Sequence, residues 1–351
     1  MKYLIFFLLS VSTATTSIGQ TPEKVEILFS KNIELMGYII HLGDPDDLDP
    51  QHPITQILNS QPTDRELPSL MKIFELAGDL DYSTITSIMY NLPQFPLPDR
   101  LPVSQILTDL FGYESEEKLQ HLNLLIMEVN KFVKNSQFET IWSQLAPHRT
   151  KTIKTLEHNQ PPASFYPVME QYYQQQFKSY KLVPSLTIWS GPGWGFRTER
   201  GTVANFVMGP IDKNFDYSNK TKLQNLAIHE FGHCFVNHVL DANTTDLIQA
   251  TEALYPPLQE SMTRQGYSNW SACITEHFVR SGEVIVATLL EDHDSAASLM
   301  DDYTNNRSFV HLPFIVKRMK KYRLKKDYAL SKAFQLTMRD LKKSSQNDKK
   351  I

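Results

Sequence analysis

The sequence predicts an α+β fold with a mostly helical N-terminal region, a small antiparallel sheet and a long helix after the sheet. Through much of the first half, apolar residues recur three and four positions apart, which is the period of an amphipathic helix. Two short runs rich in β-branched and aromatic residues follow, as expected for strands. The next helical segment carries AIHEFGHCFVNH, residues 227–238, whose histidines and glutamate suggest a function for the fold.

The composition is that of a globular protein. The chain has 351 residues, of which 41% are hydrophobic and 21% charged, enough for one large domain or two modest ones. Only Cys234 and Cys273 are present, which permits one disulfide bond but no disulfide scaffold. A disulfide between them and two separate buried thiols are both open alternatives.

Residues 1–19 have the layout of a secretory signal peptide. Lys2 precedes a short apolar run, small and hydroxyl residues follow it, and cleavage is expected after Gly19. No later segment is apolar for long enough to cross a bilayer. We therefore expect a secreted or periplasmic protein with no membrane span.

Residues 20–180 are expected to form the helical N-terminal region. Four segments have helical spacing of apolar residues: 23–43, 67–80, 116–135 and 163–181. Prolines in NLPQFPLPDRLP, residues 91–102, separate two of these helices. The acidic stretch GDPDDLDPQHP, residues 43–53, lacks the glycine and final glutamate of an EF-hand loop, which favours a polar surface loop over a calcium site.

The following region, residues 181–312, begins with the expected sheet. SLTIWS at 185–190 and TVANFVMG at 202–209 are its predicted strands. The glycine-rich GPGWGFRTERG at 191–201 is the predicted hairpin loop between them.

The helix expected from about Thr221 carries the H-E-x-x-H pattern of metal sites. His229 and His233 are four residues apart, so they project from one helical face and can reach a single ion. Two imidazoles beside a carboxylate are costly to bury without a partner. Because imidazole is a common zinc ligand, we expect Zn²⁺. Glu230 lies beside the pair, where a carboxylate can take the proton of an attacking water as a general base.

Two glutamates compete for the role of third metal ligand. Glu252 follows His233 with 18 residues between them. Glu276 lies in NWSACITEHFVRSGEVIVATLL, residues 269–290, a continuous helical pattern in which Ser271 is a natural N-cap. We favour Glu276, because a long rigid helix holds a ligand in place better than a short element, and Glu252 is the alternative.

Two of these segments together resemble a known protein family. HEFGHCFVN followed by NWSACITEHFVRS resembles an uncharacterised family of exported bacterial proteins that is grouped with the gluzincin-type zinc metallopeptidases. The shared pattern is a tryptophan, a glutamate–histidine pair and an arginine, matched here by Trp270, Glu276, His277 and Arg280. The resemblance covers roughly residues 184–312.

The resemblance implies a zincin-like catalytic domain over residues 181–312 and no known substrate. It implies a zinc site with a general base, formed by the ligands His229, His233 and Glu276 and by the base Glu230. Arg280 departs from the thermolysin-like subgroup, in which an aspartate at this position orients a histidine. A cation cannot accept a histidine N–H, so we expect Arg280 to pair with a carboxylate of a nearby glutamate or of the substrate.

A peptidase also needs groups that position its ligands, its substrate and the oxyanion. Asn237, one turn after His233, is the expected hydrogen-bond partner of that ligand. The predicted strand 202–209 precedes the motif helix, as does the edge strand with which zincins bind a peptide by β-addition. Tyr303 is the predicted catalytic oxyanion stabiliser, with His311 as the alternative, by position and donor chemistry.

Residues 313–351 form a basic segment that we expect to be helical. From Val316 to Ile351 there are 13 Lys and Arg against three Asp, so +10 in this segment stands against −14 in the remainder of a chain with net charge −4. Recurring apolar residues favour an amphipathic helix with a solvated face. Binding to an anionic surface and docking on the protein itself are the alternatives.

The sequence thus predicts an exported zinc metallopeptidase, a hydrolase that acts on a peptide or protein substrate. A zinc amidase or another hydrolase would use the same atoms, and a non-catalytic binding protein on a zincin-like scaffold is a third alternative. The intact His229, Glu230 and His233 argue against the third. Nucleic acid is not indicated, because the basic charge is confined to one segment. The sequence does not indicate the oligomeric state.

Overall fold

The computed structural model describes most of the chain after the predicted signal peptide. The described residues are 25–44, 51–78, 80–98, 101–111, 115–188, 193–211 and 215–348. The predicted signal peptide, residues 1–19, and most of the acidic stretch lie outside these ranges. Within them, no helix is both long and apolar enough to cross a lipid bilayer.

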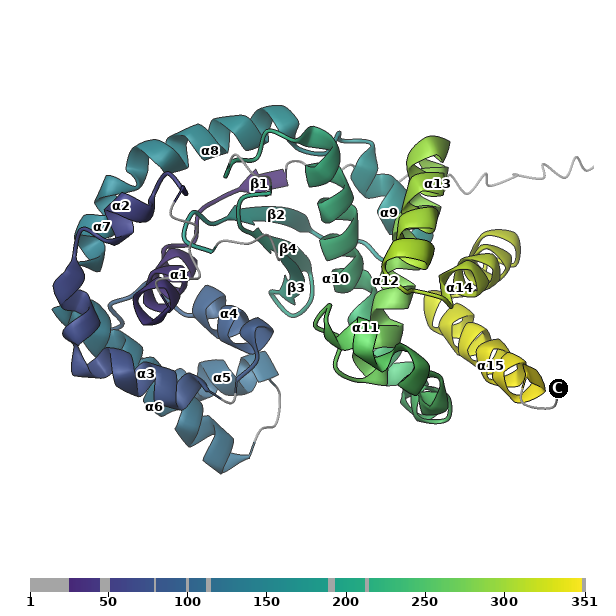
Figure 1. Ribbon diagram of the computed structural model, residues 1–351, viewed down its shortest axis with the longest axis horizontal. Coiled ribbons are helices and arrows are strands. Elements are labelled where there is room, and N and C mark those ends of the chain that lie inside the picture. The colour runs from purple at the N-terminus through teal and green to yellow at the C-terminus, as the bar shows by residue number, and fades with distance from the viewer. Residues whose placement is uncertain are drawn as a thin grey trace, which may run out of the picture.

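The protein has an α+β fold in which helices lie on both sides of one small sheet (Figure 1). The helices before the main strands are α1 (Lys31–Gly43), α2 (Thr55–Leu58), α3 (Pro68–Ala77), α4 (Tyr82–Asn91), α5 (Val103–Phe111), α6 (Glu116–Asn135), α7 (Phe138–Gln144), α8 (Ala146–Asn159) and α9 (Phe165–Tyr173). The helices after the main strands are α10 (Lys220–Gln249), α11 (Gln259–Thr263), α12 (Trp270–Leu289), α13 (His293–Asp301), α14 (Leu312–Met319) and α15 (Leu330–Asp348). Short π-helical segments η4 (Asp302–Asn306) and η5 (Lys320–Lys325) follow α13 and α14.

The sheet is mixed, so the prediction of an antiparallel sheet was wrong. Its strands are β1 (Val25–Ile27), β2 (Ser179–Pro184), β3 (Trp194–Thr198) and β4 (Val203–Met208), in the order β1-β2-β4-β3. β1 and β4 both run parallel to β2, and β3 pairs antiparallel with β4. The β1–β2 pairing joins residues more than 150 positions apart, which local patterns in the sequence cannot indicate.

Local signals misplaced two strands. Residues 185–188, predicted to be part of a strand, follow the end of β2, and β3 lies within the predicted hairpin loop 191–201. The glycines of that loop have a packing role, because a Cβ atom on Gly195 would lie 1.6 Å from the carbonyl oxygen of Glu230 on α10. Glycine here allows a strand and a helix to touch, so it is not a sign of a turn.

The predicted helices agree with the structure better than the predicted strands do, and their errors lie at the helix ends. α6 spans the predicted 116–135 and α3 lies within 67–80. The predicted helix 23–43 begins as β1, and α1 starts only after Ser30, whose side chain caps it. The predicted helix 163–181 ends at Tyr173, after which the chain turns into β2. Asn269, two residues before the predicted Ser271, caps α12.

Two hydrophobic cores meet at the sheet. Tyr180, Leu182 and Phe206 belong to the core that includes α9, α10, α12 and the C-terminal helices. Val183 and Val207 belong to the core of the N-terminal helices. Alternate residues of a strand point to opposite faces, so each core covers one face of the sheet. The sheet is thereby held between α10 and the N-terminal helices, as Figure 1 shows.

The basic C-terminal segment folds onto the body of the protein. α15 packs along α10 and against α14, and it buries one apolar face: Leu330, Ala333, Phe334, Met338 and Leu341. Its lysines and arginine lie outside that face, with Lys332, Arg339 and Lys343 exposed. Burial of one face and exposure of the other is the arrangement of an amphipathic helix.

Candidate metal centre

α10 presents the H-E-x-x-H motif between the sheet and α12. The helix begins after Asn219, whose side chain accepts a hydrogen bond from the backbone N–H of Lys222. Phe231 and Phe235 on one face are fully buried in the core. His229 and His233 are one turn apart, and their side chains are only 12% and 14% exposed. The packing of the apolar face therefore sets the direction of the histidines.

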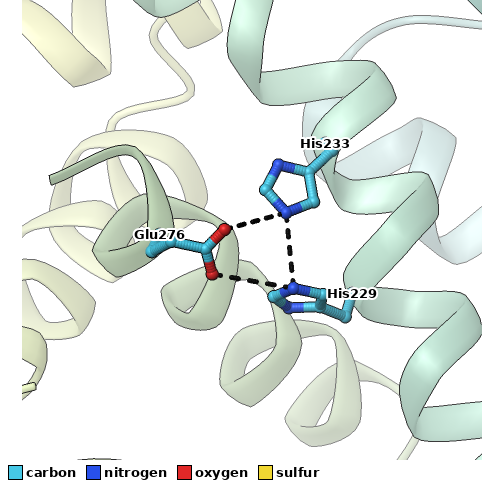
Figure 2. A group of neighbouring side chains, drawn as sticks. All are labelled: His229, His233 and Glu276. Carbon is cyan, nitrogen blue, oxygen red and sulfur yellow. Dashed lines mark hydrogen bonds and ion pairs between the residues drawn. The ribbon is translucent and has the colours of Figure 1, made fainter. Parts of the chain in front are cut away.

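α12, which packs against α10, adds Glu276 to the two histidines (Figure 2). The Nε2 atoms of His229 and His233 are 3.3 Å apart. The carboxylate oxygens of Glu276 lie 3.1 Å from Nε2 of His233 and 3.6 Å from Nε2 of His229. Ligands about 2.0–2.1 Å from a tetrahedral zinc ion are roughly 3.3 Å from one another, so the three donors have the spacing of a zinc site.

A residue that sequence reasoning missed, Glu283, orients His229. One oxygen of Glu283 lies 2.7 Å from Nδ1 of His229. Asn237 Oδ1 lies 3.1 Å from Nδ1 of His233. An acceptor at Nδ1 keeps the proton there and leaves the Nε2 lone pair free for a metal, an arrangement common for ligating histidines. The sequence carries a signal for Glu283 in its spacing, because Glu283 is seven residues after Glu276 and so lies two turns along the same face of α12.

Arg280 and Tyr303 hold the two glutamates of α12. Arg280 lies between them, with Nη2 3.4 Å from Oε2 of Glu276 and Nη1 3.9 Å from Oε1 of Glu283. The hydroxyl of Tyr303 donates to Oε2 of Glu283 at 2.6 Å. Tyr267 completes the network, since its hydroxyl lies 3.1 Å from Nη2 of Arg280 and donates to Glu276 at 3.2 Å. Arg280 thus pairs with carboxylates of the protein itself.

The charges around the three donors set their ionisation. Burial opposes ionisation of Glu276, but the positive charges of His233, His229 and Arg280 outweigh it and hold the pKa of this carboxyl well below its usual range. Burial also disfavours charged His233, yet the carboxylates of Glu276 and Glu230 raise its pKa to about 9. The carboxylates beside the two histidines thus favour a positive charge at this position.

Glu230 has a different environment, beside the donors rather than among them. Its side chain is 5% exposed, and burial raises the pKa of its carboxyl group above the usual value. The negative charge of Glu276 adds to the rise, whereas the two histidines and a backbone hydrogen bond from Gly195 act against it. A raised pKa brings a carboxylate closer to the value at which a general base works near neutral pH.

The donors lie in a cleft of about 970 Å³. One wall comes from β3, through Gly193 to Phe196, and from Ser83 and Ser87 of α4. The floor follows α10, and the other wall comes from α12, α13 and η4. The prediction that strand 202–209 forms the edge was wrong, because β4 lies inside the sheet and β3 is the edge strand beside the cleft. β3 and β4 form a hairpin, and β4, the later strand of the two, also pairs with β2 and therefore lies inside the sheet.

Comparison with known families gives one match. The family described as "Domain of unknown function (DUF4932)" matches residues 111–334, more than half of the chain. The chain belongs to this family. Searches of the curated proteins and of the solved structures returned no significant match. The matched range includes the motif of α10, Glu276, Glu283 and Tyr303, but the DUF4932 description names no metal, activity or location.

The other predicted site residues of the DUF4932 domain are not among the three donors. Glu252 is exposed, in a short 3₁₀ turn after α10. His311 packs against Trp270 and His277, with ring centroids 5.9 and 5.8 Å away, and is not among the described residues that line the cleft. Tyr303 does line the cleft, but its hydroxyl is bonded to Glu283, and its role toward an oxyanion stays a prediction.

The two cysteines of the DUF4932 domain are separate buried thiols. Cys234 lies 3.8 Å from the carbonyl oxygens of Asn205 and Glu230, and Cys273 lies 3.8 Å from Nδ1 of His277. Burial raises the pKa of Cys273 to about 12, which keeps this thiol protonated and unreactive. Of the two alternatives, the structure has the free thiols and not the disulfide.

Proposed function

We propose that this member of the DUF4932 family is an exported zinc-dependent metallopeptidase of the gluzincin type. The observation that carries the proposal is the convergence of His229, His233 and Glu276 at zinc-ligand spacing, beside Glu230 and inside a cleft. Three protein ligands, with a fourth position for water or substrate, are characteristic of catalytic zinc. Closed structural zinc sites use four protein ligands instead.

The site provides for the chemistry of peptide hydrolysis. The chemistry that zinc supplies when bound is polarisation of a carbonyl group and a lower pKa for water. Glu230 would accept the proton that water loses as its oxygen bonds to the scissile carbonyl carbon. When the carbon–nitrogen bond breaks, the same carboxyl group would deliver that proton to the departing amine. Its buried carboxylate with a raised pKa suits both transfers.

The ligands are supported by residues that fix their direction. Glu283 and Asn237 accept from Nδ1 of the two histidines. Arg280 holds the carboxylates of Glu276 and Glu283 in place, which limits the freedom of the third ligand. Such support holds a metal site in its productive geometry without requiring movement of the ligands on binding.

The edge strand favours a peptide substrate over a small amide. Gly193, Trp194, Gly195 and Phe196 line the cleft along β3, the edge strand of the described sheet, where the backbone N–H of Gly195 bonds to Glu230. An extended peptide can add to such an edge through main-chain hydrogen bonds. A small-molecule amide has no backbone with which to use this strand.

Metal analysis and a peptide-library assay test the proposal. We expect one zinc per chain in the purified protein and loss of zinc in Glu276→Ala but not in Glu252→Ala, because Glu252 is exposed and outside the cleft. Glu230→Gln should keep its zinc and lose at least about 100-fold in cleavage rate. Glu252→Gln serves as the matched control with unchanged cleavage. Stoichiometric zinc without cleavage of any peptide would refute the peptidase assignment.

A further inference from the structure

A second pocket lies on the C-terminal side of the molecule, and none of its lining residues lines the cleft. Its volume is about 560 Å³, and it lies between the end of α13, α14 and η5. The floor is apolar and is formed by Met300, Pro313 and Val316. The rest of the lining is basic and consists of Lys317, Arg318, Lys320, Lys321 and Lys325. We refer to it as the basic pocket.

The positive charge of the basic pocket is largely unbalanced. Arg318 pairs with Asp340 at 3.3 Å. Among the described residues, no carboxylate lies within ion-pair distance of Lys317, Lys320, Lys321 or Lys325. Four unpaired cations around one pocket repel one another and attract an anionic partner. An ordinary solvated helix face would mix both signs of charge.

Exposed apolar side chains accompany these lysines. Leu324 is 41% exposed and Tyr328 is 40% exposed. Lys317, Lys321 and Lys325 recur every four residues along α14 and η5, a spacing that places them on one side of the helix, and Leu324 lies beside them. Lysines together with exposed leucine and an aromatic ring are typical of protein surfaces that lie in a membrane interface.

The basic pocket is preformed and held by the core. On the inner side of α14, Ile315 and Met319 are fully buried. Arg323 of η5 donates to the backbone carbonyl of Tyr172 at 2.8 Å, which ties the segment to α9. A partner would therefore meet a rigid surface and lose little free energy in ordering it.

We propose that the basic pocket docks the protein on a membrane that carries anionic phospholipids. The four lysines match the phosphate groups of the lipids, and the apolar floor with Leu324 and Tyr328 matches the first carbons of the acyl chains. A nucleic acid would satisfy the lysines but not the apolar floor, so the combined lining favours an anionic amphiphile. The proposal is independent of the metal centre.

Docking there would hold the cleft close to the bilayer. Met300 lines the basic pocket, and its neighbour Leu299 lines the cleft, so the two sites share α13. α14 and α15 lie at the end of the molecule opposite the N-terminal helices (Figure 1). The N-terminal helices would then face away from the membrane.

Vesicle binding by the full chain tests the proposal. Co-sedimentation is measured with vesicles of phosphatidylcholine alone and with vesicles that contain about one third phosphatidylglycerol, at about 0.15 M salt. We expect binding only to the anionic vesicles. Lys317→Gln/Lys321→Gln should weaken it by about 25-fold, since each lysine near an anionic surface contributes roughly a fivefold gain. Leu324→Ser should weaken it by about tenfold.

Matched variants and a second polyanion complete the test. Lys151→Gln/Lys154→Gln removes two exposed lysines of α8 and should leave vesicle binding unchanged. Equal loss in this control would show non-specific attraction and overturn the proposal. Binding to duplex DNA without binding to anionic vesicles would also overturn it, as would equal binding to neutral and anionic vesicles.

Discussion

Glu283 shows how one side chain can hold a predicted metal site together. It accepts from His229 Nδ1 at 2.7 Å and from the Tyr303 hydroxyl at 2.6 Å, and its side chain is 2% exposed. Glu283→Gln replaces the carboxylate by a weaker, uncharged acceptor and leaves Arg280 with one carboxylate fewer. We expect zinc affinity to fall by about 10- to 100-fold, measured by competition with a chelator.

Glu260→Gln provides the control for this prediction. Glu260 lies on α11, where its side chain is 88% exposed and pairs with Arg264 on the surface. The same loss of charge there should leave zinc affinity unchanged. Unchanged affinity in Glu283→Gln would contradict the orienting role and would leave Glu283 as a structural partner of Tyr303.

Glu34 is a buried acid far from the metal centre, and it makes stability depend on pH. It is 0% exposed, and its Oε1 atom accepts a hydrogen bond from the backbone N–H of Leu186 at 2.8 Å. Burial raises its pKa from 4.5 to about 7, against smaller opposing effects of hydrogen bonds from Leu186, Ser185 and Thr187 and of the charge of Arg149. The folded state therefore binds the proton more tightly than the unfolded state does.

The sign of the pH effect follows from this difference. The stabilising contribution of protonated Glu34 is fully present below pH 4.5 and is lost as the pH rises through about 7. The loss is on the order of 3 kcal/mol. Glu34→Gln should remove this component, so the difference in urea unfolding free energy between variant and wild type should grow from pH 5 to pH 8. A difference that does not change with pH would contradict the prediction.

At the scale of elements, local patterns predicted the helices and missed the register of the strands. α6 matches its prediction because apolar residues repeat at helical spacing between a capping Ser115 and Ser136. β3 was missed because Gly193 and Gly195 are typical of a turn, whereas they are required where β3 meets Phe206 and the α10 backbone. β1 has only three residues, and its partner is distant in sequence. Local sequence patterns therefore indicate neither so short a strand nor its distant partner.

The residues of the candidate site likewise divide into those that a local sequence pattern predicts and those that it does not. His229, Glu230 and His233 were predictable because one helical turn determines their spacing. Glu276 was preferred to Glu252 because a long helix positions a ligand well and because the family resemblance implies it, and the structure brings it to the histidines. Glu283 was missed because the family pattern directed attention to the position of Arg280, three residues earlier, where the thermolysin-like subgroup has its orienting acid. The orienting group lies one helical turn further along α12.

At the scale of the molecule, the N-terminal helices and the cleft form one structure. α4 lies against the edge strand, where the rings of Tyr90 and Phe196 are 5.2 Å apart. The Tyr90 hydroxyl also donates to the fully buried Asn205 of β4 at 3.0 Å. Ser83 and Ser87 of the same helix line the cleft. The helical region therefore supplies part of the wall that a substrate would meet.

This arrangement predicts that the cleft-bearing half cannot fold alone. A chain that begins at Glu116 lacks β1 and α1 to α5, which would expose the sheet face that carries Val183 and Val207 to water. Uncovering a largely apolar face removes more stability than a domain usually has to spare. We expect this fragment to lose cooperative thermal unfolding by circular dichroism and to bind a hydrophobic dye, whereas the full chain should show a single transition. Cooperative unfolding of the fragment at the melting temperature of the full chain would show two independent domains.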